Sequence, residues 1–288
     1  MRLYLGLLCA LAACTGDIIA PPPLPVPVEP PAVPPGPFEP QPAGLRLLTA
    51  RQYEASLIAL FGQAAARRVG AWSTSIAAAQ GGVSANQVED YETAALAVAS
   101  ALFAGDRMAL TGCSPVANDG CARSYLTRIG RLAFRRALTD DELKRYQGLA
   151  ADASAELQDA WKGLELATAA LLQSPHFLYR VELPVDGGFP AEALASRLSF
   201  TLTNGPPDAR LLDDAERGRL QEPEVLRLHT RRLLVEATAK GALGQLLNDW
   251  LQVDDLLTLE KDPQLFPAFD ASLALSMRDE IEAALSIH

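Results

Sequence analysis

Apolar residues recur every three or four positions along most of the chain from Leu45 onward, which is the spacing that lines one face of a helix. No stretch alternates apolar and polar residues for long enough to predict more than a little sheet. The pattern therefore predicts an all-α fold, a multi-helix globular body that follows a signal peptide and a Pro-rich linker.

Helix-capping residues locate the first helices of this body. Thr49 with Gln52 forms a capping box at the start of a helix that Gly62 can end. Asn86 is expected to open a second helix, which runs through Ala104 after a loop at 70–85.

The apolar spacing continues through the rest of the chain. It predicts a helix from Cys121 onward with Arg128, Arg131 and Arg135 on another face. A further helix is expected after the capping box of Thr139 and Glu142. A long helix is expected from Leu157 to near Ser174. Later helices are expected at 190–203, 223–235, 239–253 and 270–287.

These elements divide the chain into five segments. We expect a signal peptide at 1–13, a lipid anchor and Pro-rich linker at 14–44, an N-terminal helical region at 45–120, an Arg-rich helical region at 121–185, and a C-terminal helical region at 186–288 that is incomplete.

The N-terminus has the features of an export signal. Arg2 precedes an apolar run that is too short for a bilayer core, which needs about 20 residues. The run ends in Leu11-Ala12-Ala13-Cys14, which resembles the lipobox of bacterial lipoproteins. The resemblance implies cleavage before Cys14, lipidation of its sulfur, and export to a membrane. Thr15 in place of an acidic residue favours the outer membrane over the inner one, while an ordinary secretory signal with a chance cysteine is the alternative.

A stalk follows the predicted anchor. Twelve prolines occur in the 22 residues from Pro21 to Pro42. Proline fixes φ and removes the amide donor, so polyproline II is expected, with a reach on the order of 70 Å. A spacer is the favoured interpretation, and a ligand for an aromatic groove is the alternative.

The net charge and the cysteines indicate which kinds of partner and bond to expect. The formal net charge of −10 argues against nucleic-acid binding, which needs a basic face. Cys113 and Cys121 are separated by a turn-forming segment, and in an oxidising envelope such a pair predicts a disulfide. A metal site is the alternative, but a second pair of ligands is lacking nearby. The expected partners are therefore membrane lipid, through Cys14, and other envelope proteins.

Several ordered blocks resemble one family, the planctomycete-surface-type domains of unknown function, which are also common in myxobacterial lipoproteins. The most specific block is Leu171-Leu172-Gln173-Ser174-Pro175-His176-Phe177-Leu178-Tyr179-Arg180-Val181-Glu182. Two departures are Ala137, where the family usually has proline, and the end of the chain at His288, which suggests truncation. Many relatives are fused to or encoded with c-type haem domains, but this chain has no Cys-x-x-Cys-His motif, so haem is expected only in a partner or fused domain. The other blocks are 46–54, 121–142, 194–199, 207–208, 247–251 and 266–270.

Few side chains suggest chemistry. His176 is the best candidate for a functional group, with Arg180 and Arg197 as weaker ones, and an imidazole at that position could act as an acid or base. The competing interpretation is that His176 caps helix carbonyls while its neighbours fill the core. His229, among arginines, is expected on the solvated surface. The histidines lack zinc-site spacing, so no metal or cofactor site is expected in this chain.

Adjacent carboxylates and large aromatic residues are given structural roles. The pairs at 140–141, 213–214 and 254–255 are expected to cap helices or face solvent, because neighbours on a helix do not share a face. Tyr53, Trp161 and Trp250 are expected in the core.

Two functions remain open. The first is a lipid-tethered helical scaffold or binding module of the cell envelope, associated with a c-type cytochrome or redox assembly. The second is an envelope enzyme with a site around His176 and Arg180 that residues beyond His288 would complete.

Overall fold

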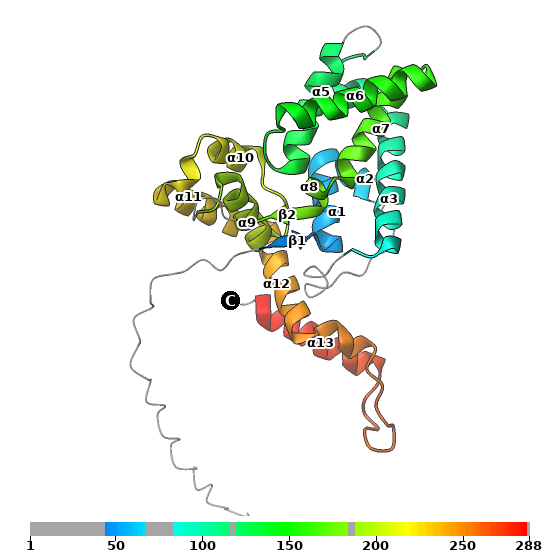
Figure 1. The fold of residues 1–288 in the computed structure, drawn as a ribbon. Helices are drawn as coiled ribbons and strands as arrows, with labels where there is room; N and C mark the ends of the chain where they lie inside the picture. Colours follow the sequence, from blue (N-terminus) through cyan, green and yellow to red (C-terminus); the bar gives the residue numbers. More distant parts are fainter. Residues whose placement is uncertain (1–43, 67–82, 116–118, 184–187, 287–288) are drawn as a thin grey trace, which may run out of the picture. The chain divides into compact units, whose positions relative to one another are not determined.

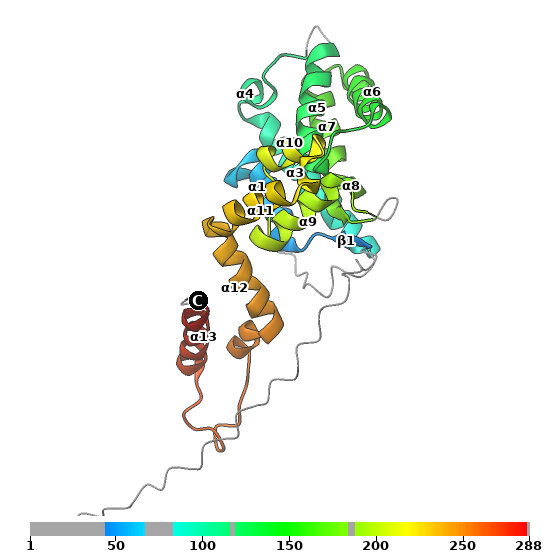
Figure 2. The same ribbon diagram turned by 90° about the vertical axis from the view of Figure 1, so that its left-hand side faces the viewer.

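A computed structural model of the protein describes residues 44–66, 83–115, 119–183 and 188–286, shown in Figure 1 and turned by 90° in Figure 2. The predicted signal peptide, Cys14 and the Pro-rich linker lie outside these residues, as do most of the predicted loop at 70–85 and the two C-terminal residues. All described residues fall within one unit, Pro42–His288.

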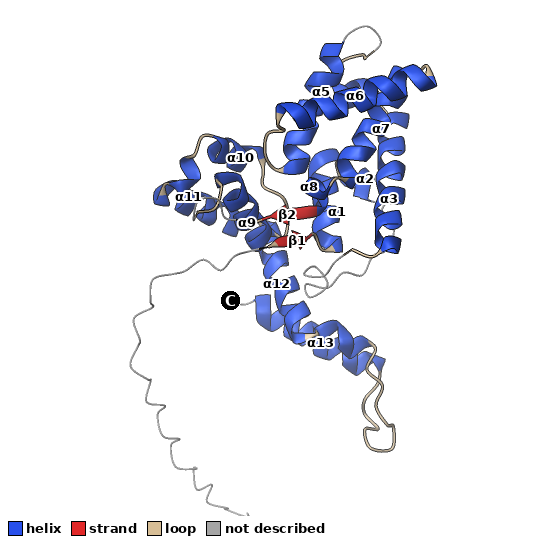
Figure 3. Ribbon diagram, in the orientation of Figure 1, coloured by secondary structure: helices blue, strands red, loops and turns tan. Residues whose placement is uncertain are grey.

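Helices dominate the described secondary structure, and the all-α prediction is confirmed (Figure 3). The sheet consists of two short antiparallel strands, β1 (Leu45–Leu47) and β2 (Tyr179–Val181). They bring the start of the body beside a segment more than 130 residues later, with Arg46 opposite Arg180. Leu48 N–H extends the pairing by donating to the Leu178 carbonyl at 2.8 Å.

Capping boxes open three of the helices. Thr49 caps α1 (Ala50–Phe61) and Thr139 caps α6 (Asp140–Leu157), as predicted. The predicted start of the next helix at Asn86 is wrong, because Ser84 and Gln87 form the capping box of α3 (Ala85–Ala104). The Ser84 hydroxyl accepts a hydrogen bond from the backbone amide of Gln87, which has no partner within the first turn of α3.

The predicted long helix from Leu157 to Ser174 is also wrong at its start. α6 ends at Leu157, Gln158 takes a left-handed conformation, and the Asp159 carboxylate caps α7 (Ala160–Gln173). The shorter elements of this region are α2 (Gln63–Ala66), α4 (Arg107–Thr111), α5 (Asp119–Phe134) and α8 (Pro175–Leu178).

The C-terminal part contains the four predicted helices with small shifts in their ends, and a helix that was not predicted. The helices are α9 (Ala191–Thr203), α11 (Pro223–Leu234), α12 (Ala237–Leu251) and α13 (Ala271–Ser286), and the additional helix is α10 (Ala209–Glu216). Two 3-10 turns, η2 (Arg219–Gln221) and η3 (Val253–Leu257), complete it.

Two groups of buried apolar side chains hold these helices together. The first lies among α1, α3, α5, α7 and α8 and includes Tyr53, which was predicted to be buried. The second lies among α9, α10, η2 and α11, and its members are Ala191, Ala195, Leu211, Ala215, Leu220, Val225 and Leu233. Phe200, on α9, belongs to the first group.

The apolar side chains of α12 and α13 are less well covered. Trp250 is 75 % exposed, so the prediction that it lies in the core is wrong. The helical spacing identified an apolar stripe, but among the α12 side chains that the structure describes, the buried ones are the small Ala239 and Ala242. Trp161, on α7, is partly buried against the first core, and the Cζ atom of Arg107 lies 4.7 Å from the centre of its ring.

α6 and α7 pack against each other at a glycine. A Cβ placed on Gly163 would lie 2.3 Å from the Ala150 carbonyl oxygen and 1.9 Å from the Ser154 hydroxyl oxygen. Because the nearest backbone atom belongs to a helix, it cannot move aside as a flexible side chain would.

We therefore predict that Gly163→Ala lowers the free energy of unfolding by about 1–3 kcal/mol through overpacking. Gly148 of α6 is the matched control, since a Cβ there meets nothing within 4 Å. Gly148→Ala should raise stability by about 0.5–1 kcal/mol. Urea unfolding of both variants measures the two effects, and equal changes in the two would contradict the close packing of α6 on α7.

Candidate functional site

A buried arginine lies at the centre of the candidate site. Arg135 directly follows α5, has a positive φ of 59°, and is 3 % exposed. Its burial corrects the sequence prediction, which placed it with Arg128 and Arg131 on a separate polar face. The helix has ended before Arg135, so the helical spacing no longer determines where its side chain goes.

The Arg135 guanidinium binds backbone carbonyls. Nη2 donates to the His176 and Tyr179 oxygens at 2.7 Å each, and Nη1 donates to the Phe177 oxygen at 3.2 Å. The last carbonyls of a helix lack partners within it, so Arg135 satisfies acceptors at the end of α8 and the start of β2 that would otherwise be buried unpaired.

An aromatic ring and a second arginine complete this environment. The Cζ atoms of Arg135 and Arg180 lie 5.7 Å and 5.3 Å from the centre of the Phe200 ring. In the part of the chain that the structure describes, no carboxylate pairs with Arg135. Burial lowers the pKa of Arg135 to about 9, with further lowering by Arg180 and Arg136, so the group remains protonated at neutral pH.

His176 lies in a neighbouring ion-pair cluster. Arg136 binds both oxygens of Glu142 at 2.8 Å. The imidazole lies beside this pair, with Nδ1 3.3 Å from Arg136 Nη2 and Nε2 3.3 Å from Glu142 Oε1. A guanidinium can only donate, so Nδ1 accepts from Arg136, and the proton of the neutral imidazole resides on Nε2, the nitrogen near Glu142.

The charges within this cluster determine the protonation states of Glu142 and His176. Hydrogen bonds from Arg136 lower the pKa of Glu142 to about 2, and the Thr139 amide adds to the effect against the opposing influence of burial. Burial and then Arg136 lower the pKa of His176, while Glu142 acts in the opposite direction. At neutral pH the cluster is therefore a neutral histidine on a permanent ion pair.

Arg180 lies beside a buried glutamate. Its Nη2 is 3.6 Å from Glu182 Oε1, and the Glu182 side chain is 4 % exposed. Burial lowers the pKa of Arg180, Glu182 raises it, and the nearby Arg46 and Arg197 lower it. Arg197 lies with its Cζ 5.3 Å from the centre of the Phe189 ring.

The structure does not gather His176, Arg180 and Arg197 into one site. No hydrogen bond or ion pair among the described residues joins His176 to either arginine. Arg135 lies between them, since it binds the His176 carbonyl and shares the Phe200 ring with Arg180. In place of carbonyl capping by His176, which the sequence suggested, Arg135 binds the carbonyls.

The expectation that His229 faces solvent is wrong, because its side chain is fully buried. His229 shares one face of α11 with Val225 and Leu233, four positions away on either side, and that face packs into the second core. Nε2 lies 2.9 Å from Asp214 Oδ2, and Nδ1 lies 3.2 Å from Arg232 Nη2.

Asp214 also departs from its expected role. Instead of capping a helix or facing solvent, it is buried and accepts from His229, and that hydrogen bond lowers the pKa of Asp214. Its neighbour Asp213 pairs with Arg131 at 2.5 Å. The rule that adjacent helical residues face apart holds here, but each carboxylate finds a different partner.

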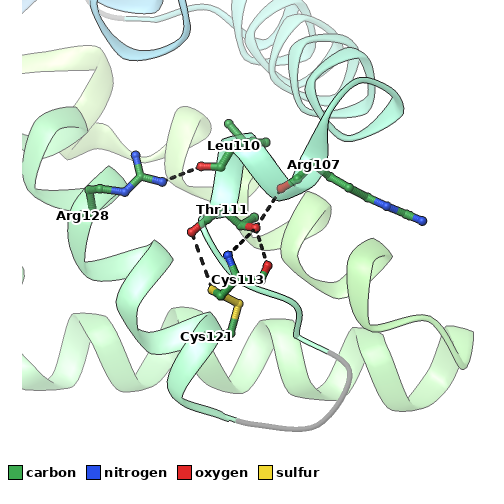
Figure 4. Close-up of a disulfide and its surroundings, with 6 residues drawn as sticks. All are labelled: Arg107, Leu110, Thr111, Cys113, Cys121 and Arg128. Carbon is green, nitrogen blue, oxygen red and sulfur yellow. Dashed lines mark hydrogen bonds between the residues drawn. A yellow bond between two sulfur atoms is a disulfide. The ribbon is translucent and has the colours of Figure 1, made fainter.

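The predicted disulfide is confirmed and is shown in Figure 4. Cys113 and Cys121 are bonded with their Cα atoms 5.6 Å apart, which joins the segment after α4 to α5. The Thr111 hydroxyl oxygen lies 2.6 Å from the Cys113 carbonyl oxygen and 2.8 Å from the Arg107 carbonyl oxygen, and its single proton can be donated to either one.

The described residues contain no group of three or more His, Cys, Asp or Glu side chains that could hold a metal ion. Among the described helices, none combines the length and the hydropathy that a membrane span requires.

Comparison with known proteins identifies two segments. Residues 121–182 match the family model described as PSD5, protein of unknown function (DUF1595). Residues 190–287 match the model described as PSD4, protein of unknown function (DUF1592). No curated protein and no solved structure matches the chain. Arg135 and His176 lie in the first segment and Phe200 in the second.

The ion pair of Glu142 predicts a defined acid sensitivity. The folded-state pKa of Glu142 is below its ordinary value of 4.5, so its contribution is present above pH 4.5 and is lost as pH falls toward about 2. We expect the stability advantage of the wild type over Glu142→Gln to shrink across that interval. Urea unfolding at several pH values measures it, with Glu156→Gln, at the exposed end of α6, as the control. A pH-independent difference would contradict the ion pair.

Proposed function

The chain belongs to the PSD5 family over residues 121–182 and to the PSD4 family over residues 190–287, and from this premise we propose that it is a lipid-anchored binding module of the bacterial cell envelope. The order of its sequence features supports this role. The sequence that resembles a lipobox, ending at Cys14, precedes a Pro-rich spacer, and the helical body follows. Such an order suits a domain that is held at a membrane and reaches away from it.

The geometry around His176 is the observation that favours binding over catalysis. Nδ1, the ring nitrogen that a general base would use, already accepts from Arg136, and Nε2 lies 3.3 Å from Glu142 Oε1. General base catalysis would require His176 to release Arg136 first. Arg180 is the second residue of the enzyme site that the sequence suggested. It contacts Glu182 and Phe200 and has no contact with His176 among the described interactions.

Envelope proteins are the proposed partners. The resemblance of the sequence to proteins that occur with c-type haem domains favours a redox assembly among them, with the haem carried by the partner. The outer membrane is the proposed location, since a threonine follows Cys14.

The test of the anchor is metabolic labelling of the full chain with radioactive palmitate in a double-membraned bacterium. Wild type should carry the label and sediment with outer membranes, while Cys14→Ser should lose the label. Cys9→Ser is the matched control, because Cys9 lies in the predicted signal peptide and should leave labelling unchanged. An unlabelled wild type, or a labelled Cys14→Ser variant, would contradict the proposal. A Soret band that accompanies wild type out of the same membranes would support a haem-containing partner.

A further inference from the structure

Three arginines converge beside the two-stranded sheet. Arg46 of β1 and Arg180 of β2 are directly opposite in the register, so their side chains leave the same face of the sheet. Arg197 is on α9, which packs against β2 and which also supplies Phe200 beneath the Arg180 guanidinium. The two strands and the helix that packs against β2 therefore each carry an arginine.

Their charges are only partly compensated. Among the described residues, Glu182 is the one carboxylate that forms an ion pair with any of the three arginines, and that pair with Arg180 is loose at 3.6 Å. The Arg180 Nε and Glu182 Oε1 atoms are buried without a hydrogen-bond partner. Arg46 and Arg197 are exposed, and within the described ranges neither has an ion pair. The cluster carries more positive charge than its one carboxylate can balance.

This arrangement is unfavourable without a further anion. Like charges directly opposite in a sheet repel, and Arg135, whose Cζ lies 5.7 Å from the centre of the same Phe200 ring, is a fourth cation. Arg46 and Arg197 also lower the pKa of Arg180, which is consistent with their closeness. The chain as a whole has a net charge of −10, so a basic cluster does not follow from its composition.

We propose that Arg46, Arg180 and Arg197 bind a small oxyanion, a carboxylate or a phosphate group, between the β1–β2 sheet and α9. Guanidinium groups present planar pairs of donors that match the oxygens of these groups. Arg46 and Arg197 contact the ligand from the solvent side, and Arg180, held by Phe200 and Glu182, forms the floor of the site.

This inference deepens the proposed binding role, and it rests on that role only for the location of the ligand in the envelope. The test is isothermal titration of the purified full chain in a nonionic detergent with sodium phosphate, sodium galacturonate and, as a neutral probe, galactose. Wild type should bind at least one of the two anions saturably and should not bind galactose. Phosphate alone or galacturonate alone would identify which oxyanion the site takes.

The variants are Arg46→Gln and Arg197→Gln, whose exposed side chains make folding insensitive to the change. Each should weaken anion binding at least tenfold. Arg145→Gln is the matched control, because it removes the same charge from an exposed position on α6 and should leave binding unchanged. The absence of saturable binding to wild type, or equal binding by all variants, would overturn the proposal. Detergent-solubilised Cys14→Ser should bind as wild type does, so failure of the anchor and failure of the site are distinguishable.

Discussion

The Arg135 guanidinium is buried without a carboxylate, and the packing around it depends on how that charge is accommodated. Carbonyls of His176, Phe177 and Tyr179 accept its hydrogen bonds, and the face of Phe200 lies beside it. A buried polar group that loses its partner costs about 1–3 kcal/mol. Removing this one side chain would leave several carbonyls unpaired at once, so it fixes the path of the chain from α8 into β2.

That path determines where the neighbouring polar groups lie. Because the carbonyl of His176 binds Arg135, its imidazole is left on the side where Arg136 and Glu142 form their ion pair. Arg180 lies two residues beyond the last part of α8 and stacks on the same Phe200 ring. Phe200 belongs to the PSD4 segment and Arg135 to the PSD5 segment, so this contact joins the two family segments of the chain.

The sequence predicted those features that depend on local spacing. Capping boxes at Thr49 and Thr139 opened helices as expected, and the close cysteine pair formed a disulfide. The failures have a common cause in tertiary contacts. Arginine usually faces solvent and histidine is intermediate, yet acceptors elsewhere in the chain make the burial of Arg135 and His229 favourable.

For His229, the helical spacing of its apolar neighbours did indicate burial, but the arginines beside it were given more weight. Val225, His229 and Leu233 share one face of α11, but the adjacent arginines suggested a wet surface. No comparable pattern marks Arg135, whose backbone has left the helix. The separation of His176 from Arg180 was also beyond prediction, since it depends on the direction that the chain takes after α8.

The most direct test of this account is the free energy of unfolding of Arg135→Met, measured in urea beside Arg145→Met. Methionine fills much of the same volume but donates no hydrogen bonds, so we expect the free energy of unfolding to fall by on the order of 3 kcal/mol or more. Arg145→Met, at an exposed position on α6, should change stability by less than about 0.5 kcal/mol. An Arg135→Met protein as stable as wild type would contradict the central place given to this guanidinium.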